Sequence, residues 1–472
     1  MGVSPSPGGP PHPPPPLRVR LDSTWRRPTE APADGKVVIA GSPLRLFRLS
    51  TGGAHVIAMA ETGEVPDTAS IRTLIERFID AGALHPAPTA GPFTAADVTV
   101  VLPTFGRVPA ALGTPALAGL RTIVIDDASP TAVQVPQAEG VTVVRRTGNG
   151  GPSAARNTGL AQVATPVVAF VDADVHLPEG WLQPLLAHFA DEQVALVAPR
   201  IVGAAGTGAI ADYEQRRGAL DLGTEPARIA AGTRVSYVPA AVLVCRTDAI
   251  RAMNGFDEGM RLGEDVDLVW RLADAGHRCR YEPAVVAEHE PRAQLAGWAR
   301  QRFGYGRSAA SLARRHPGAL APVRMNGWSL LAWGLLLARR PFLALGVAAG
   351  TTVALQRKLT DVPPRESSRM AGLGHLAAGR QLAQATTRVW WPITVLAAAS
   401  SRRARLPVAA AVVVPVLIDA LRARSVQPVL DAPLALADHA AYGAGVWAGV
   451  LAERELGPLL PDVRSWPPRG GR

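Results

Sequence analysis

The sequence predicts an α/β protein whose central unit is a mainly parallel sheet, preceded by a small α+β unit and followed by a helical region. Strand-like and helix-like runs alternate through the middle of the chain, as in βαβ units. The chain before them holds two short strand-like and two helix-like runs, and the chain after them is rich in Ala, Leu and Val. The predicted segments are a disordered proline-rich leader (1–16), the small unit (17–86), a linker (87–95), the sheet unit (96–315) and the helical tail (316–472).

Composition excludes several classes of protein. With 472 residues, of which 47% are hydrophobic, the chain can bury large cores in two or three domains, which argues against a disordered or fibrous protein. Its two cysteines, Cys245 and Cys279, lie in apolar surroundings, which argues against a disulfide framework and fits a reducing compartment.

The net charge of +10 could suggest nucleic-acid binding. No helix-turn-helix, zinc-finger or aromatic RNA-binding pattern accompanies the charge, so we expect no nucleic-acid partner. Arginines cluster after residue 290, between apolar stretches, and this distribution suits an anionic membrane surface. Because the amino terminus lacks the apolar core of a signal peptide, we expect the cytoplasmic face of the cell membrane.

The small unit shows strand-like runs at 36–40 and 44–49, then a helical run at 54–60. Ser70 is the expected N-cap of a second helix. Five apolar side chains share one face of that helix: Ile71, Leu74, Ile75, Phe78 and Ile79.

This pattern resembles the winged-helix modules that recognise peptides in ribosomal-peptide natural-product pathways. The resemblance implies that residues 17–86 capture a leader peptide as an added strand, so a peptide-binding partner protein is also possible. An extension that only packs on the central unit is the alternative.

The sheet unit has three strands that end in polar residues at one edge. The first runs into Pro103 and Thr104, the second into Asp126 and Asp127, and the third, at 167–171, into a pair of aspartates. Further strand-like runs are expected at 141–144 and 194–198, with helices from Ser153 and over 181–189.

Asp172 and Asp174 follow the most apolar of these strands. Alternate side chains of an extended backbone point to the same face, so the two carboxylates can converge on one ion. Hard oxygen ligands suit Mg²⁺ or Mn²⁺ bound together with substrate phosphates. A solvated strand end that caps the next helix is the alternative.

Five motifs in order resemble those of the family 2 glycosyltransferases, which have the GT-A nucleotide-sugar-binding fold. They cover about residues 96–300 and are Val-Val-Leu-Pro103-Thr104, Ile-Asp126-Asp127-Ala-Ser, Asn149-Gly-Gly151-Pro-Ser-Ala-Ala-Arg156-Asn157, Asp172-Ala-Asp174 and Gly263-Glu264-Asp265. The resemblance implies a UDP-sugar donor, a divalent metal, and inversion at the anomeric carbon.

The same resemblance implies roles for individual residues. Asp174 coordinates the metal, Asp172 reaches the ribose or the metal, and His289 completes the metal or diphosphate site, unless it is only a structural histidine. The residues expected to hold the donor are Pro103, Thr104, Asp126, Asp127, Asn149, Gly151, Arg156, Asn157 and Asp172. The helix from Ser153 would present free N–H groups to the nucleotide, and Arg156 would supply a guanidinium fork.

Asp265 is the expected catalytic base, because inverting sugar transfer needs a group that takes the proton of the acceptor hydroxyl. It lies in the first turn of an amphipathic helix, where Glu264 and Asp267 can keep it basic. Glu264 is expected to orient the acceptor or the base. For Asp267, a helix-dipole role is the simpler interpretation.

Two departures limit what the resemblance implies. The run at 238–241 differs from the family's usual pattern, so the acceptor pocket is not assigned. The Gln-x-x-Arg-Trp motif of processive synthases is missing, and residues 294–298 are only a near match, so addition of one or a few sugars is expected. The turn Gly148-x-Gly150-x-x-Ser153 also mimics a dinucleotide-binding fingerprint, which leaves an NAD-dependent oxidoreductase as a rival.

The tail contains apolar stretches at 325–338, 341–355 and 407–418, each shorter than the roughly 20 residues that span a bilayer. Residues 433–452 are long enough but include Asp438 and His439. A membrane hairpin, interfacial helices and a soluble helical bundle all remain open, and membrane association is favoured.

The order of domains resembles that of the family 2 glycosyltransferases of the mycofactocin pathway. The resemblance implies hexosyltransferase activity that moves glucose from UDP-glucose to a peptide-derived redox cofactor or its precursor. A cell-wall enzyme acting on a polyprenyl-linked glycan is the alternative, and a non-catalytic membrane scaffold is a third class.

Overall fold

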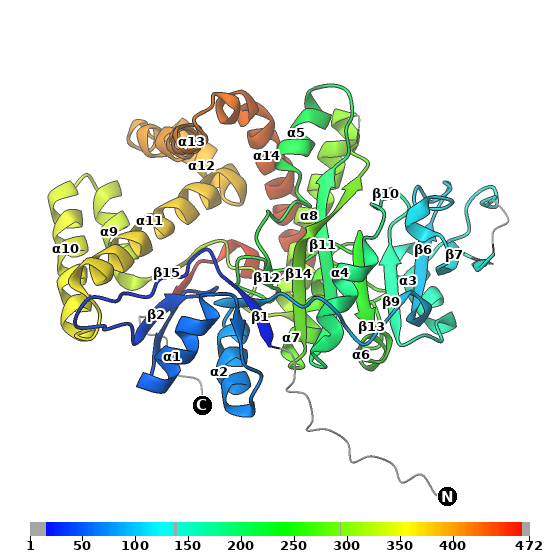
Figure 1. The fold of residues 1–472 in the computed structure, drawn as a ribbon. Coiled ribbons are helices and arrows are strands. Elements are labelled where there is room, and N and C mark those ends of the chain that lie inside the picture. Colours follow the sequence, from blue (N-terminus) through cyan, green and yellow to red (C-terminus); the bar gives the residue numbers. More distant parts are fainter. Residues whose placement is uncertain (1–15, 136–138, 293, 465–472) are drawn as a thin grey trace, which may run out of the picture.

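The computed structural model describes residues 16–135, 139–292 and 294–464. All but the last residue of the predicted leader (1–16) lies outside these ranges. Figure 1 shows a central sheet with the small amino-terminal unit beside it and a group of helices at the far end. The described chain begins and ends on the same side of the molecule (Figure 1).

A nine-stranded sheet forms the centre of the molecule. Its helices are α3 (Gly151–Gln162), α4 (Leu182–Ala187), α5 (Ala209–Arg217), α6 (Thr247–Ala252) and α7 (Glu264–Asp274). In spatial order, the strands are β10 (Val175–His176), β14 (Arg278–His289), β11 (Val194–Gly203), β13 (Val242–Arg246), β9 (Val167–Val171), β6 (Val98–Thr104), β7 (Arg121–Asp126) and β8 (Val141–Arg145), with β12 (Ala227–Arg228) beside β14.

The sheet is mixed rather than mainly parallel, which corrects the prediction. β9, β6, β7 and β8 run parallel, and so do β11 and β14, but β13 lies antiparallel between β9 and β11. The run that forms β13 was not recognised as a strand in the sequence. An apolar run does not indicate whether a strand will lie parallel or antiparallel to its neighbours. That orientation depends on the segments that connect the strands.

Two apolar cores cover the two faces of the sheet, and β9 shows how the sequence divides between them. Val168 and Phe170 pack with α3, α6 and α7, whereas Val167, Ala169 and Val171 pack with α4. This alternation is the period of two expected of a strand buried on both faces. The predicted strands and helices of the central unit are present, although α3 begins two residues before Ser153.

The amino-terminal unit folds around its own core and has ion pairs to both other parts. Its strands β4, β1 and β5 pair with one another, and β2 pairs with β3. Arg278 of β14 binds Asp80 (2.7 Å), and Arg26 binds Glu366 of the tail (2.8 Å). The elements are β1 (Leu17–Leu21), β2 (Val37–Ala40), β3 (Arg45–Arg48), α1 (Thr51–Ala60), β4 (Glu64–Val65), α2 (Ala69–Asp80) and β5 (Leu84–Pro86).

The second helix of this unit has the predicted apolar face, since Ile75, Phe78 and Ile79 are buried in its core. The predicted cap is wrong, however. Thr68 is the N-cap of α2, with extended backbone angles, and Ser70 lies inside the first turn. The side chain of Thr68 makes no capping hydrogen bond, and helix ends placed from sequence are commonly off by one or two residues.

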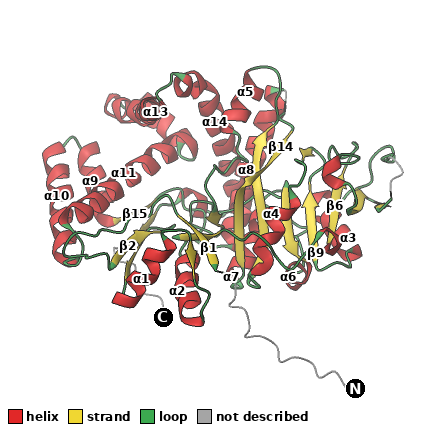
Figure 2. Ribbon diagram, viewed as in Figure 1, coloured by secondary structure: helices red, strands yellow, loops and turns green. Residues whose placement is uncertain are grey.

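The tail is helical, and Figure 2 shows the helices between residues 327 and 423 grouped apart from the strands of the central sheet. A short strand pair, β15 (Arg324–Asn326) and β16 (Asp462–Arg464), joins its two ends. The helices are α8 (Leu295–Arg315), α9 (Gly327–Leu337), α10 (Pro341–Lys358), α11 (Pro364–Arg388), α12 (Trp391–Ser400), α13 (Arg402–Ala423) and α14 (Gln427–Glu453).

Helix α14 is not a membrane candidate, although residues 433–452 looked long enough in the sequence. Its glycines let its backbone approach α8 closely. An ideal Cβ on Gly445 would lie 2.0 Å from the carbonyl oxygen of Phe303, and one on Gly306 would lie 1.9 Å from that of Tyr442. Asp438 is paired with Arg302 of α8 (3.1 Å), so the charge within this apolar stretch is used in packing.

Helix α13 is the long apolar helix that the sequence did not predict. Residues 407–418 lie inside a 22-residue helix, Arg402–Ala423, which within the described residues is the one helix long and apolar enough to cross a membrane. None of its most apolar window is buried. The stretch at 407–418 was judged too short to span a bilayer, but the helix continues through the flanking arginines because arginine is a good helix former.

Candidate active site

A cavity of about 960 Å³ lies where the carboxyl edge of the sheet meets the tail helices. One wall holds the ends of β6 and β9, the first turns of α3 and α7, and the loop before β13. The opposite wall holds α8, α11 and α14. The cavity is therefore completed by a region that the motifs of the sequence do not include.

The sheet edge brings the predicted polar strand ends together. β6 and β7 are neighbouring parallel strands in which Thr104 is opposite Asp126, and β9 is the other neighbour of β6. Pro103, Thr104, Asp172 and Asp174 all reach the cavity. The Thr104 hydroxyl donates to the Arg107 carbonyl at 2.5 Å, which fixes the loop that leaves the strand.

Asp174 and His289 meet because β10 pairs with the end of β14. The two side chains lie 3.4 Å apart, between His289 Nε2 and Asp174 Oδ1. Burial disfavours both charges, but their contact raises the pKa of His289 and lowers that of Asp174. Arg107 and Arg292 lie 3.8 and 3.9 Å from the same carboxylate, so the site is rich in positive charge.

These residues fit a divalent ion only in part. Within the described residues, no group of three His, Cys, Asp or Glu side chains is arranged to hold a metal. One oxygen of Asp172 is already paired with Arg156, at 2.6 Å. Asp174 and His289 supply two ligands, which suits Mg²⁺ or Mn²⁺ when substrate phosphate oxygens supply others.

Asp127 lines the cavity and also caps α3. Its carboxylate accepts the backbone N–H groups of Gly150 (3.1 Å) and Gly151 (2.8 Å) and pairs with Arg146. The backbone N–H groups of these two glycines are therefore already bonded within the protein. The Asn149 amide donates to the Asp127 carbonyl (3.1 Å). Because the glycine amides donate to a carboxylate, the turn does not support the dinucleotide-binding interpretation.

Arg156 is the centre of a buried charge network rather than a free fork. It is 3% exposed, and it donates to Glu264 (2.8 Å) and to Asp172 (2.6 Å). Burial opposes its charge, but the two carboxylates together raise its pKa. Its Nε has no hydrogen-bond partner among the described residues. Arg156 therefore links Asp172, which follows β9, to Glu264 at the start of α7.

Glu264 and Asp265 begin α7 and line the cavity. Gly263 precedes them with φ of +83°, a conformation that glycine adopts without strain. Asp265 accepts the N–H groups of Ala240 (3.1 Å) and Val266 (2.8 Å), which fix its position. Burial raises its pKa, and burial with the neighbouring Asp265 charge raises the pKa of Glu264 to about 7.

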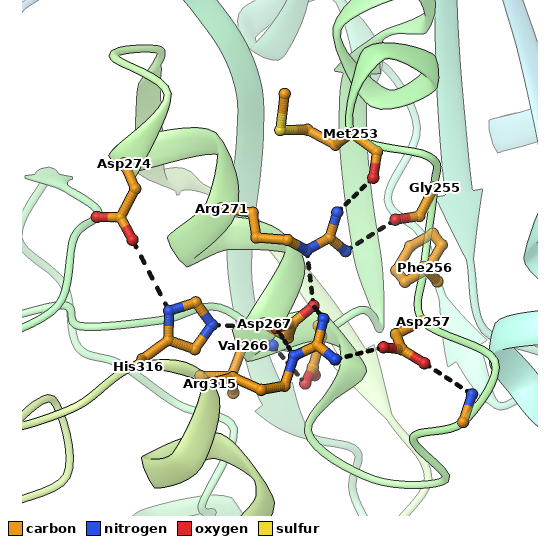
Figure 3. A network of polar contacts seen from close by, with 12 residues as sticks. Met253, Gly255, Phe256, Asp257, Val266, Asp267, Arg271, Asp274, Arg315 and His316 are labelled. Atoms are coloured by element: carbon orange, nitrogen blue, oxygen red, sulfur yellow. Dashed lines mark hydrogen bonds and ion pairs between the residues drawn. The ribbon is translucent and has the colours of Figure 1, made fainter.

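Asp267 does not line the cavity, and its polar contacts instead anchor α7 to neighbouring segments (Figure 3). Its fully buried carboxylate accepts from Arg271 (2.7 Å), Arg315 (2.6 Å) and His316 (3.0 Å). Arg271 also binds carbonyls in the loop 253–255. Asp267 thus joins α7 to the end of α8, which is a larger structural role than the predicted dipole contact.

Two predicted donor residues do not line the cavity. Asp126 is 1% exposed and accepts from the backbone N–H of Ser129 (2.9 Å) and from Arg145 (2.5 Å). Asn157 binds the backbone of Phe256, with bonds of 2.8 and 2.9 Å. Both side chains shape the loops around the site, because their polar atoms are already paired.

The sequence motifs did not include several side chains that line the cavity. Arg107 follows the first motif by three residues. It could have been predicted as a site residue if the loop after that motif had been included. The others come from segments outside the motifs, and tertiary packing brings them here. They are Tyr237, Arg292, Arg302, Tyr305, Arg388 and Tyr442.

Comparisons with known proteins agree with this arrangement. The family model described as "Glycosyl transferase family 2" matches residues 99–242. Pre-mycofactocin glycosyltransferases from two strains of Mycobacterium tuberculosis are each 41% identical to this chain over 451 residues, which is 92% of this chain and 95% of theirs. The succinoglycan biosynthesis protein ExoA of Rhizobium meliloti is 29% identical and covers 39% of this chain and 58% of its own.

Among solved structures, the mannosyltransferase PcManGT from Pyrobaculum calidifontis, in complex with GDP-Man and Mn²⁺, aligns with 63% of this chain and 89% of its own. The sequence identity is 19% and the TM-score is 0.35. A likeness this distant supports no inference about the site.

Proposed function

This chain belongs to glycosyl transferase family 2 and is a hexosyltransferase, and from that premise we propose that it transfers one or a few sugars from a UDP-sugar to a peptide-derived acceptor, with inversion. The proposed donor is UDP-glucose. The proposed acceptor is the precursor of the redox cofactor mycofactocin, because the relatives that match nearly the whole chain are named for that precursor.

One observation carries the proposal: a single cavity contains both the Asp172–Asp174 edge and Asp265, with Arg156 bridging to Glu264 beside it. An inverting transfer needs a base on the side of the sugar opposite the leaving group. Asp265 takes the proton of the acceptor hydroxyl, the hydroxyl oxygen bonds to the anomeric carbon, and the carbon–oxygen bond to UDP breaks.

A divalent ion at Asp174 and His289 would neutralise the diphosphate leaving group as a Lewis acid. Around that position, Arg107 and Arg292 supply further positive charge. Arg156 holds Asp172 in place through a hydrogen bond of 2.6 Å.

We propose that the amino-terminal unit binds a peptide in a groove of about 490 Å³ between β3 and the helices α1 and α2. Among the described residues, β3 pairs only with β2, so its outer edge can accept an added strand. Leu74 lines the groove. Leu74→Asp should abolish binding of the pathway's precursor peptide to the full chain, measured by fluorescence anisotropy, and leave UDP binding unchanged. Equal peptide binding by the variant would contradict the proposal.

We propose that the tail helices α10, α12 and α13 attach the protein to the cytoplasmic face of the cell membrane. Phe342, Leu396 and Leu421 are 87%, 69% and 77% exposed, which is unusual for large apolar side chains in water. Arginines flank them and suit anionic lipid. The full chain should float with phosphatidylglycerol vesicles, and replacing these three residues by serine should reduce flotation. A protein that stays at the bottom of the gradient with every lipid would contradict the proposal.

The function is tested by incubating the protein with the pathway precursor and UDP-glucose, GDP-mannose or UDP-N-acetylglucosamine in separate reactions, with Mn²⁺. Mass spectrometry should show hexose addition with UDP-glucose, and NMR should show inverted configuration. A product made only from a polyprenyl phosphate acceptor supplied in parallel would overturn the peptide-derived assignment. A product made only from GDP-mannose would overturn the donor.

A further inference from the structure

Four polar side chains that line the cavity make no side-chain hydrogen bond or ion pair within the described part of the chain. Tyr237, Tyr305, Tyr442 and Arg388 all line it, and within the described ranges none of the three phenol groups makes a hydrogen bond. Arg388 makes no ion pair there, and its buried Nε is unsatisfied. Polar groups away from solvent usually have hydrogen-bond partners in a folded protein. Several groups without such partners at one place indicate that a bound molecule or water completes them.

Arg388 differs sharply from the other arginine of this wall. Arg302 is 2% exposed and is neutralised by Glu214 and Asp438. Arg388 instead lies over the ring of Tyr442, with its guanidinium carbon 3.9 Å from the ring centre. A cation–π contact holds the guanidinium in one plane without using its N–H groups, which leaves them free to donate to a ligand.

The phenols lie close to the proposed base. Tyr237 is two residues from Pro239 in the loop whose Ala240 N–H binds Asp265. Burial raises the pKa of Tyr237 and of Tyr305, and the Asp265 charge adds to both effects. Both phenols therefore stay protonated at neutral pH and can donate as well as accept.

Apolar side chains also lie on this wall. Leu312, Leu320, Val389 and Val446 line the cavity beside the phenols. A site with hydroxyl donors and acceptors on one side and aliphatic groups on the other suits a ring that carries hydroxyl groups. It suits a strongly anionic ligand less, because Glu264 and Asp265 lie on the same cavity.

We propose that Tyr237, Tyr305, Tyr442 and Arg388 form the acceptor subsite, which binds a neutral, hydroxyl-bearing ring and places one hydroxyl at Asp265. Arg388 is the anchor, since it has the most unused donors. The inference rests on the proposed sugar transfer and adds to it the position and chemistry of the acceptor. It also makes α8, α11 and α14 part of the active site rather than an attachment only.

A matched pair of probes distinguishes the two rings that fit this chemistry. 4-Methylumbelliferone presents an aromatic hydroxyl, and its β-glucoside presents a sugar ring. Transfer from UDP-glucose to each is measured with wild type, Arg388→Gln, Tyr442→Phe and Arg380→Gln. Arg380 is the control, because it lies on the same helix, is 62% exposed and is paired outside the cavity with Asp419.

We expect Arg388→Gln to lower kcat/KM for the better probe at least tenfold, mainly through KM, and Tyr442→Phe to lower it several-fold. UDP affinity, measured by calorimetry, should not change in either variant, because neither side chain is placed at the donor. Arg380→Gln should match wild type. Tyr442→Phe removes one oxygen only, so it keeps the test valid if Arg388→Gln does not fold.

Equal kcat/KM in Arg388→Gln, Tyr442→Phe and wild type would overturn the acceptor subsite. A parallel loss of UDP affinity would also overturn it, because it would place Arg388 on the donor. If wild type neither binds UDP nor hydrolyses UDP-glucose, the proposed function itself fails, and this outcome is separate from the other two.

Discussion

The two walls of the cavity differ in how their polar groups are used. On the sheet wall, Asp127, Arg156 and Asp265 each hold protein hydrogen bonds that fix their positions. On the helical wall, Tyr305 and Arg388 have no polar partner among the described residues. The difference teaches that the sheet wall is rigid before substrate arrives, whereas the helical wall still has bonds to form with substrate.

This contrast suits an enzyme that uses one nucleotide donor but must recognise a particular acceptor. Prearranged charges act on the reacting bond without being reorganised during the reaction. Unpaired donors give selectivity, because an acceptor that cannot satisfy them leaves them buried and unbonded.

Asp265→Asn tests the sheet wall most strongly. The amide keeps the shape of the side chain but cannot take a proton, so kcat should fall by roughly 10²–10⁴, the usual contribution of a general base. UDP affinity should stay the same. An asparagine variant with wild-type kcat would show that another group accepts the proton.

Arg156→Met should destabilise the fold by about 3–5 kcal/mol, because it leaves the buried carboxylate of Glu264 and the half-buried carboxylate of Asp172 without their cation. Urea unfolding measures the loss. Arg72→Met is the control: its ion pair with Asp67 is at the surface, with the arginine 54% exposed, and removing it should cost no more than about 1 kcal/mol. Similar losses in the two variants would contradict the central role given to Arg156.

Gly306→Ala tests the packing behind the helical wall. The new methyl group would collide with the carbonyl of Tyr442 on α14, which should cost about 1–3 kcal/mol and raise KM for the acceptor more than Kd for UDP. Gly297→Ala is the control on the same helix, since an ideal Cβ there meets nothing within 4 Å. It should be neutral or slightly stabilising. A rise in both constants for Gly306→Ala would indicate that the two walls are not separate.

The smallest expected effect is a shift in the acidic limb of the pH profile of kcat/KM. The pKa of Glu264 is raised to about 7 by burial and by Asp265, while Arg156 opposes the shift. The pair therefore holds a proton up to near neutral pH, and kcat/KM should fall as the pH drops through about 7. In Glu264→Gln the neighbouring charge is gone, the pKa of Asp265 falls, and the limb should move to lower pH. If the acidic limb of the Glu264→Gln variant stays at the wild-type pH, Glu264 does not influence the pKa of the catalytic base.

The sequence predicted the sheet wall because its residues follow strands or begin helices, and such positions are recorded in local patterns. Asp172, Asp174 and Asp265 are of this kind. The direction of β13 was not predictable, since it depends on connections rather than on composition. Nor were the pairing of Asp126 and the contact of Arg156 with Glu264, because which polar atoms are already bonded is decided by tertiary structure.

The helical wall could not be found in the sequence. Arg388 and Tyr442 belong to segments with no local motif, and they reach the cavity because glycines let α14 pack against α8. The repeated small residues of residues 302–307 and 443–449 were the available signal. They were interpreted through hydropathy instead, which left the packing of residues 433–452 undecided between a membrane segment and a soluble bundle.

The central claim is that the sheet wall binds a uridine diphosphate through a metal at Asp174. Calorimetric titration of UDP into the full-length protein, with and without Mn²⁺, tests it for wild type and Asp174→Ala. We predict binding that requires Mn²⁺ in wild type and is lost in the variant. No UDP binding by folded wild type, or equal Mn²⁺-dependent binding by both proteins, would contradict the account.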